Sequence, residues 1–140
     1  MRTYLVTGGA GFIGSNYIHY MFRKYGDTIR IINVDALTYA GNLENLKDIE
    51  DRDNYTFIKA DIRDREAIEK IFAENDIDRV VHFAAESHVD RSIVNPEIFV
   101  ETNVLIYHLL VTVFCVFAYI VQQKLSIVRL TWVPGSGSLV

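Results

Sequence analysis

A glycine-rich segment near the start of the chain has the spacing of a phosphate-binding loop. Gly8, Gly11 and Gly14 follow a β-rich run at residues 3–7 and open a helical stretch that continues to about Tyr25. The first two glycines permit a tight turn and close approach of backbone to a pyrophosphate, and the third lets the helix pack near the strand. The start of the helix would offer unpaired N–H groups and a positive dipole end to phosphates. Glycines alone could mark only a turn, so the assignment depends on their surroundings.

An aspartate follows this loop at the distance expected in a dinucleotide site. A second β-rich run, residues 30–35, ends in Asp35, roughly 20 positions beyond the last loop glycine. A carboxylate there hydrogen-bonds the ribose hydroxyls of adenosine, whereas the alternative is a solvated loop aspartate. Ala36, Leu37 and Thr38 include no arginine that could receive a 2′-phosphate. The sequence therefore favours NAD over NADP.

Strands alternate with helices in the rest of this region. Residues 55–59 predict a third strand, Asp64 the cap of a helix that continues to about Asn75, and residues 79–85 a fourth strand. The fourth strand is nearly continuous in apolar residues, as a parallel strand covered on both faces should be. Residues 95–97, Asn-Pro-Glu, predict another helix start. The alternation predicts an α/β fold, a Rossmann-type doubly wound parallel sheet.

The distribution of charge divides the chain. All 18 acidic residues lie between Asp27 and Glu101, and the only charged residues after Glu101 are Lys124 and Arg129. We therefore expect an incomplete NAD-binding domain over residues 1–105 and an atypical apolar segment with a flexible tail over 106–140.

The uncharged run at residues 105–121 has three interpretations: a buried helix or strand, a membrane anchor, or a segment never selected to fold. The positive residues that follow disfavour the anchor, because they would leave the glycine loop outside the cytoplasm.

The overall composition excludes several classes of function. A formal net charge of −4 and a pI near 5.5 give no basic face for nucleic acid. Cys115 is the only cysteine, so no intrachain disulfide can form, and no Cys or His spacing suggests a metal site. The N-terminus reaches the glycines too soon for a secretory signal, so we expect a cytoplasmic protein.

Three strings resemble the extended short-chain dehydrogenases/reductases of the NAD-dependent epimerase/dehydratase family. They are Thr-Gly-Gly-Ala-Gly-Phe-Ile-Gly at residues 7–14, Asp-Ala-Leu-Thr-Tyr-Ala-Gly-Asn-Leu-Glu-Asn-Leu at 35–46, and His-Phe-Ala-Ala-Glu-Ser-His-Val-Asp-Arg-Ser at 82–92. The last two look like the dehydratases that act on dTDP-glucose, and the match continues to about Leu105. Another nucleotide-sugar epimerase or dehydratase, or a non-catalytic NAD-binding module, are the alternatives.

The resemblance also implies roles for individual residues. It places Phe12 and Ile13 at the pyrophosphate. The adenosine ribose would be surrounded by Asp35, Ala36, Leu37 and Thr38, and adenine would lie beside Asp61 and Ile62. The nicotinamide side would be lined by Phe83, Ala84, Ala85, Glu86 and Ser87, with Thr102 approaching the cofactor. Ser87 would also reach the sugar substrate, whereas His88 is interpreted as a structural loop residue.

The catalytic residues that the resemblance implies have no counterpart here. The family uses a Tyr-x-x-x-Lys pair and an Asp-Glu pair beyond position 105, whereas here Tyr119 precedes Gln123 at that spacing and no acid follows Glu101. We interpret two earlier matches, at residues 20–24 and 55–59, as coincidence, because they fall on the glycine-loop helix and along a strand. We predict that the chain is an inactive N-terminal part of such an enzyme. The resemblance implies a homodimer, which we do not expect of this part alone.

Overall fold

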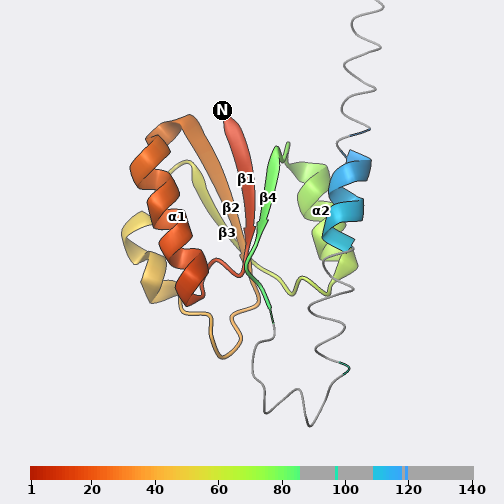
Figure 1. Ribbon diagram of the computed structural model, residues 1–140, viewed down its shortest axis with the longest axis horizontal. Helices are drawn as coiled ribbons and strands as arrows, with labels where there is room; N and C mark the ends of the chain where they lie inside the picture. The colour runs from red at the N-terminus through yellow and green to blue at the C-terminus, as the bar shows by residue number, and fades with distance from the viewer. Residues whose placement is uncertain (86–96, 98–108, 118, 120–140) are drawn as a thin grey trace, which may run out of the picture.

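The computed structural model describes residues 1–85, 97, 109–117 and 119 (Figure 1). The strands are β1 (Arg2–Thr7), β2 (Ile29–Asp35), β3 (Tyr55–Lys59) and β4 (Arg79–His82). The α-helices are α1 (Phe12–Tyr25) and α2 (Arg65–Glu74), and short 3₁₀ helices are η1 (Gly26–Thr28) and η2 (Leu43–Ile49). Residues 109–117 are also helical.

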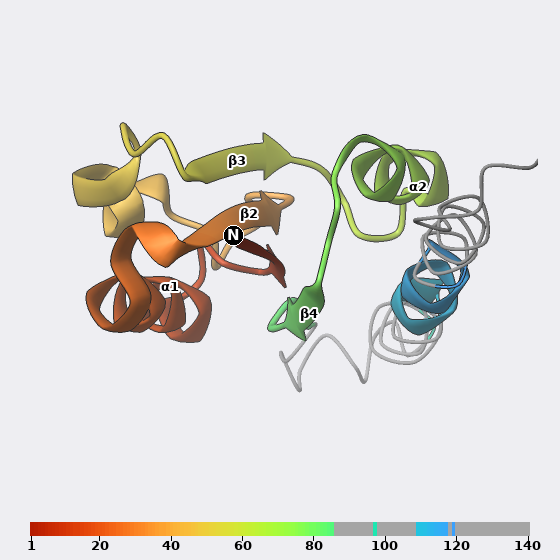
Figure 2. The ribbon, with the colours of Figure 1, turned by 90° about the horizontal axis from the view of Figure 1, so that it is seen from above.

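The four strands form one parallel sheet in the order β3-β2-β1-β4. In its centre, β1 pairs with β2 through Thr7 and Val34 and with β4 through Thr7 and His82. The chain moves outward from β1 to β3 and then returns to the other side of β1, so the strand order reverses there. Figure 2 shows α1 and η2 on one face of the sheet and α2 with residues 109–117 on the other. The predicted doubly wound α/β fold is confirmed.

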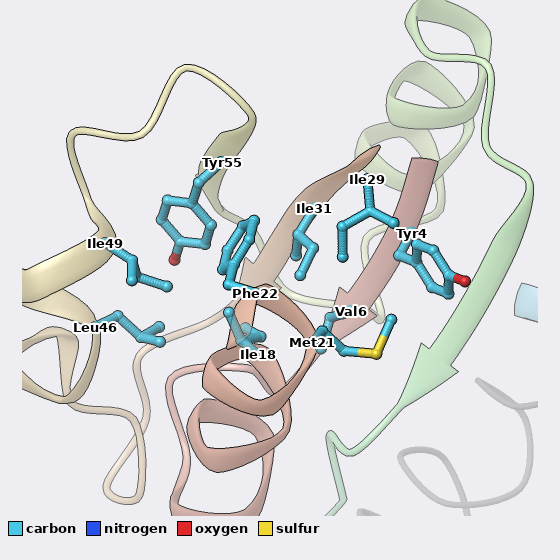
Figure 3. Packing of buried hydrophobic residues seen from close by; sticks show 10 residues of the cluster. All are labelled: Tyr4, Val6, Ile18, Met21, Phe22, Ile29, Ile31, Leu46, Ile49 and Tyr55. Atoms are coloured by element: carbon cyan, nitrogen blue, oxygen red, sulfur yellow. The ribbon is translucent and has the colours of Figure 1, made fainter. Parts of the chain in front are cut away.

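Each face of the sheet has its own hydrophobic core. Successive side chains of a strand point to opposite faces, so Tyr4 and Val6 pack toward α1 whereas Leu5 packs toward α2. The α1 side, drawn in Figure 3, combines strand residues with side chains from α1 and η2: Tyr4, Val6, Ile18, Met21, Phe22, Ile29, Ile31, Leu46, Ile49 and Tyr55. Coverage on both faces explains why apolar residues follow one another inside the central strands, as at Tyr4, Leu5 and Val6, instead of alternating with polar ones.

The helix at residues 109–117 completes the second core. Leu110 and Val113 are buried, and the rings of Phe114 and Phe117 lie 6.3 and 5.9 Å from that of Phe72 on α2, measured between centroids. Residues 109–117 thus form a helix with one buried face, whereas Val111, Cys115 and Val116 are exposed, so the interpretation of the whole uncharged run as a buried element stays a prediction. No helix in the described part of the chain is long and apolar enough to span a membrane. The division of the chain at residue 105 stays a prediction.

The elements differ from the sequence prediction mainly at β4, which ends at His82 instead of Ala85. The Phe83 N–H still donates to the carbonyl of Thr7, at 2.8 Å, but β1 then turns away at Gly8 and leaves Ala84 without a strand to pair with. The 3₁₀ helices were not predicted, whereas the cap at Asp64 is confirmed. The predicted helix start at residues 95–97 lies outside the described residues except for Glu97.

Candidate functional site

A pocket of about 320 Å³ opens at the carboxyl ends of β1, β2 and β4. Ligands of doubly wound folds bind at this edge, where the strand order reverses. The pocket combines the glycine loop, the loop after β2, the turn after β3 and the residues after β4. Its lining consists of Gly8, Gly11, Val34, Asp35, Ala36, Thr38, Tyr39, Ala40, Gly41, Asp61, Ile62, Arg63, Phe83, Ala84 and Ala85.

The glycine loop turns sharply at Gly8 and packs tightly against α1. Gly8 has a φ of 71°, in the left-handed region that favours glycine, and its N–H donates to the Val34 carbonyl at 2.8 Å. A Cβ on Gly14 would lie only 2.7 Å from the Cα of Gly9. The first turn of α1 therefore rests directly on the loop that follows β1, whereas the sequence analysis expected Gly14 to bring the helix close to the strand itself.

The start of α1 is left bare beside the pocket. Its N-cap is Gly11, and among the described residues no side chain caps the helix and no acid occupies its first turn. Phe12 and Ile13 point into solvent, 82% and 67% exposed, and do not line the pocket, so their place at the pyrophosphate stays a prediction. By contrast, the Asp64 carboxylate caps α2 by accepting the Ala67 N–H at 3.0 Å.

This bare helix start can accommodate an anion. A Cβ on Gly11 would meet no described protein atom closer than 3.4 Å, although Gly11 lines the pocket. Protein packing therefore does not require glycine here, whereas a ligand lying against the backbone would. Unpaired N–H groups at a helix start are suited to phosphate oxygens.

Asp35 lies at the carboxyl end of β2 and is buried, so it is not the solvated loop aspartate considered as the alternative. One carboxylate oxygen accepts the Ala10 N–H at 2.9 Å, and the other accepts the Leu37 N–H at 2.8 Å. The second bond supports the backbone of Leu37, whose φ of 53° is unusual for a side chain of its size. Each carboxylate oxygen can accept a further hydrogen bond, so Asp35 retains acceptor capacity toward the pocket.

Of the other three residues predicted to surround the ribose, two line the pocket and one packs against its lining. Ala36 and Thr38 line the pocket, while Leu37 does not and packs instead against Gly41. The lining also includes Tyr39, Ala40 and Gly41, to which the sequence argument gave no role. Their place within the string at residues 35–46 was the available signal.

The turn after β3 brings Asp61 and Ile62 to the same pocket, together with Arg63, while their place beside adenine stays a prediction. The guanidinium of Arg63 contacts both carboxylate oxygens of Asp61, at 3.1 and 2.7 Å, and its backbone N–H donates to one of them at 2.9 Å. Hydrogen bonding from the Arg63 side chain lowers the pKa of Asp61. Asp61 is therefore a fixed, ionised acceptor, and Arg63 is a site residue that the sequence argument missed.

The residues after β4 close the pocket on its remaining side. Phe83, Ala84 and Ala85 line it, and the Phe83 ring lies 5.2 Å from that of Tyr17 on α1, measured between centroids. Their place beside the nicotinamide stays a prediction. His82 is hydrogen-bonded to the Thr7 hydroxyl, and burial lowers the pKa of its imidazole. Glu86, Ser87, His88 and Thr102 lie outside the described residues, so the roles predicted for them stay predictions.

The two Tyr-x-x-x-Lys matches lie away from this pocket. On the exposed face of α1, the Lys24 ammonium donates to the Tyr20 hydroxyl at 3.1 Å. Tyr55 is buried and accepts a hydrogen bond from Asn33 at 3.0 Å, whereas Lys59 is exposed. Neither pair lines the pocket, which agrees with their interpretation as coincidence. Within the described ranges, no cluster of three or more His, Cys, Asp or Glu side chains could hold a metal ion.

Comparison with known proteins gives consistent matches over most of the chain. The family described as GDP-mannose 4,6 dehydratase matches residues 5–120. The dTDP-glucose 4,6-dehydratase of Shigella flexneri is 54% identical over 101 residues, which are 72% of this chain and 27% of that protein. A relative from Neisseria meningitidis with the same name is 50% identical over 105 residues, covering 75% of this chain and 29% of the relative.

Solved structures agree in fold. The dTDP-glucose 4,6-dehydratase of Bacillus anthracis, in complex with NAD, has a TM-score of 0.67 and 48% identity, covering 79% of this chain and 32% of that one. A UDP-glucose 4-epimerase from Thermotoga maritima has a TM-score of 0.70 and 32% identity, covering 82% of this chain and 34% of that one. The chain thus spans about a third or less of the length of these relatives.

Proposed function

Because this chain belongs to the GDP-mannose 4,6-dehydratase family, we propose that it supplies the NAD-binding part of a dTDP-glucose 4,6-dehydratase. The observation that carries the proposal is the pocket in which the bare start of α1 and the buried carboxylate of Asp35 face the same space. A helix start of this kind binds a phosphate and a carboxylate binds hydroxyl groups. A dinucleotide carries phosphate groups and ribose hydroxyls at adjacent positions.

The residues that line the pocket support an arrangement of NAD along it, with adenine at one end and nicotinamide at the other. In the proposed complex, the N–H groups at the start of α1 bind the pyrophosphate and Asp35 accepts the ribose hydroxyls of adenosine. The same carboxylate repels a 2′-phosphate, so NADP binds less well. Asp61, held ionised by Arg63, accepts hydrogen bonds at the adenine end, and residues 83–85 flank the nicotinamide end.

The proposed overall reaction converts dTDP-glucose to dTDP-4-keto-6-deoxyglucose and water. When bound, NAD supplies the group that accepts a hydride from the sugar and later returns it. The part played by the described residues is to bind and orient that cofactor. We also propose that Glu86, Ser87 and Thr102 extend the site, with Ser87 reaching the sugar, and that the protein is cytoplasmic.

Isothermal titration calorimetry with NAD⁺ and NADP⁺ tests the cofactor assignment. We expect binding of NAD⁺ and weaker binding of NADP⁺, because only the latter brings a phosphate toward the Asp35 carboxylate. Equal affinity for the two would contradict the role given to Asp35. Absence of NAD⁺ binding would contradict the proposed function itself.

A second proposal concerns turnover by the 140-residue chain, which we expect to act as a cofactor-binding module without dehydratase activity. After Glu101 the chain offers no acid, and Tyr119 has Gln123 where the family pattern requires lysine. Loss of one general acid or base commonly costs about 10² to 10⁴-fold in rate, and here all are missing.

The assay is formation of the 4-keto-6-deoxy sugar from dTDP-glucose and NAD⁺, with a full-length dehydratase as the positive control. We expect no measurable product from this chain. A rate near that of the control would mean that residues 106–140 supply a catalytic arrangement. Tyr107, Tyr119 and Lys124 would then be the first residues to replace.

A further inference from the structure

The backbone of Ala10, in the middle of the glycine loop, is held on one side by the last residue of β2 and on the other by the segment that follows β2. Its N–H donates to the Asp35 carboxylate at 2.9 Å. Its carbonyl accepts the Asn42 N–H at 3.0 Å and the Asn45 side-chain amide at 3.2 Å. Ala10 is itself fully buried. Three hydrogen bonds at one residue therefore join the loop to the last residue of β2 and to the segment that follows it.

Asn45 makes this contact from a well-anchored position in η2. The next residue, Leu46, is buried in the core beside Ile18 of α1. The backbone carbonyl of Asn45 is hydrogen-bonded to the His19 imidazole at 2.7 Å, and the side chain of Asn42 caps η2 by accepting the Glu44 N–H at 3.0 Å. The amide of Asn45 is thus presented to Ala10 by an element fixed against α1.

The direction of the Ala10 carbonyl matters for an anion in the neighbouring pocket. A carbonyl oxygen turned toward a phosphate would repel it, whereas the loop binds anions by presenting N–H groups. In the structure the carbonyl is directed to η2, and the N–H of the same peptide, on Gly11, donates to the Gly8 carbonyl at 3.3 Å. Asn45 does not line the pocket in the part of the chain that is described, so it acts only through Ala10.

We propose that Asn45 is a positioning residue for dinucleotide binding, whose side-chain amide holds the Ala10 carbonyl away from the phosphates and keeps the glycine loop in its binding conformation. This inference rests on the proposed function, because the ligand is the NAD of that proposal. Asn45 lies in η2 and does not line the pocket, so in this proposal it affects binding only through the backbone of Ala10.

The test compares two substitutions at Asn45 with a matched control in the full chain. Asn45→Ala removes the amide, and Asn45→Asp keeps its shape but has no N–H to donate. Asn75→Ala removes an equivalent bond, since the Asn75 amide donates to the Ile71 carbonyl at 2.8 Å at the end of α2. NAD⁺ affinity is measured by calorimetry, stability by urea unfolding, and exchange of the Ala10 amide hydrogen by NMR without cofactor.

We expect both Asn45 variants to bind NAD⁺ about three- to tenfold more weakly, the range of one net hydrogen bond. Asn75→Ala should lower the free energy of unfolding about as much as Asn45→Ala does, because each removes one hydrogen bond, while its NAD⁺ affinity stays within about twofold of that of the unaltered chain. Exchange at Ala10 should accelerate in the Asn45 variants alone.

Each other outcome overturns the inference in a recognisable way. If the unaltered chain binds NAD⁺ and the Asn45 variants bind it equally well, the positioning role is wrong while the proposed function stands. Equal weakening by Asn75→Ala would assign the effect to general stability, and unchanged exchange at Ala10 would show that Asn45 does not hold the loop. If the unaltered chain fails to bind NAD⁺, the proposed function fails and this inference fails with it.

Discussion

Replacement of Gly8 by alanine should destabilise the fold for two separable reasons. The first is conformational, because Gly8 has a φ of 71°. The second is steric, because a Cβ at this position would lie 2.7 Å from the Cα of Ala84 and 2.8 Å from the carbonyl carbon of Phe83. Both are backbone atoms beyond the end of β4, which cannot move aside without displacing the strand.

Gly26 provides a matched control that isolates the steric part. Its φ is 54°, yet no described atom lies within 4 Å of the Cβ that alanine would add. Gly26→Ala should therefore cost only backbone strain, about 1–3 kcal/mol. Gly8→Ala adds overpacking of about 1–3 kcal/mol, so its total cost should be about 2–6 kcal/mol. That total is a large fraction of the roughly 5–15 kcal/mol that stabilises a typical domain.

Urea unfolding followed by circular dichroism measures both costs, provided that the dependence of the unfolding free energy on urea is unchanged. We expect Gly8→Ala to be the more destabilising substitution by about 1–3 kcal/mol. Equal losses in the two variants would refute the reasoning, because they would show that the backbone after β4 does not approach Gly8 as closely as described.

Three further predictions concern single side chains. Asp35→Ala should weaken NAD⁺ binding by about 1–3 kcal/mol and reduce the preference over NADP⁺, as calorimetry would reveal; unchanged affinities would dismiss its role. Since burial lowers the pKa of His82, the unfolded chain binds a proton more readily, so stability should fall as the pH drops below 6.5 and level off below the folded-state pKa. Between pH 7.5 and about 5, the melting temperature should depend less steeply on pH in His82→Asn than in the unaltered chain, and an identical dependence would contradict this. Asp64→Ala should cost about 0.5–2 kcal/mol in urea unfolding, whereas Asp64→Asn, which can still cap α2, should cost less; equal losses would argue against the cap.

The elements that could be predicted are those determined by residues close to one another in the sequence. A β-rich run, a glycine loop and a helical stretch identify β1 and α1, and Asp64 identifies the start of α2. Long-range contacts decided the rest. The end of β4 depends on where β1 turns away, and η2 depends on burial of Leu46 and Ile49 against α1.

The same distinction applies to the candidate site. The position of Asp35 followed from its distance along the chain from the glycines. That its carboxylate accepts the Ala10 N–H could not be predicted, because the bond joins residues 25 positions apart through the folded sheet. Arg63 was missed because its role depends on how the turn after β3 brings it onto Asp61.

The bare start of α1 puts fold stability and ligand affinity in competition for the same N–H groups. A serine or aspartate in place of Gly11 would satisfy them from within the chain and could gain about 0.5–2 kcal/mol, as N-caps commonly do. That side chain would then act as a built-in inhibitor, already seated where the pyrophosphate is proposed to bind. Selection for a higher melting temperature alone would favour such a variant at the expense of binding. In the unaltered protein, inorganic phosphate in the buffer would act as an external cap, so the melting temperature without cofactor should rise with phosphate concentration.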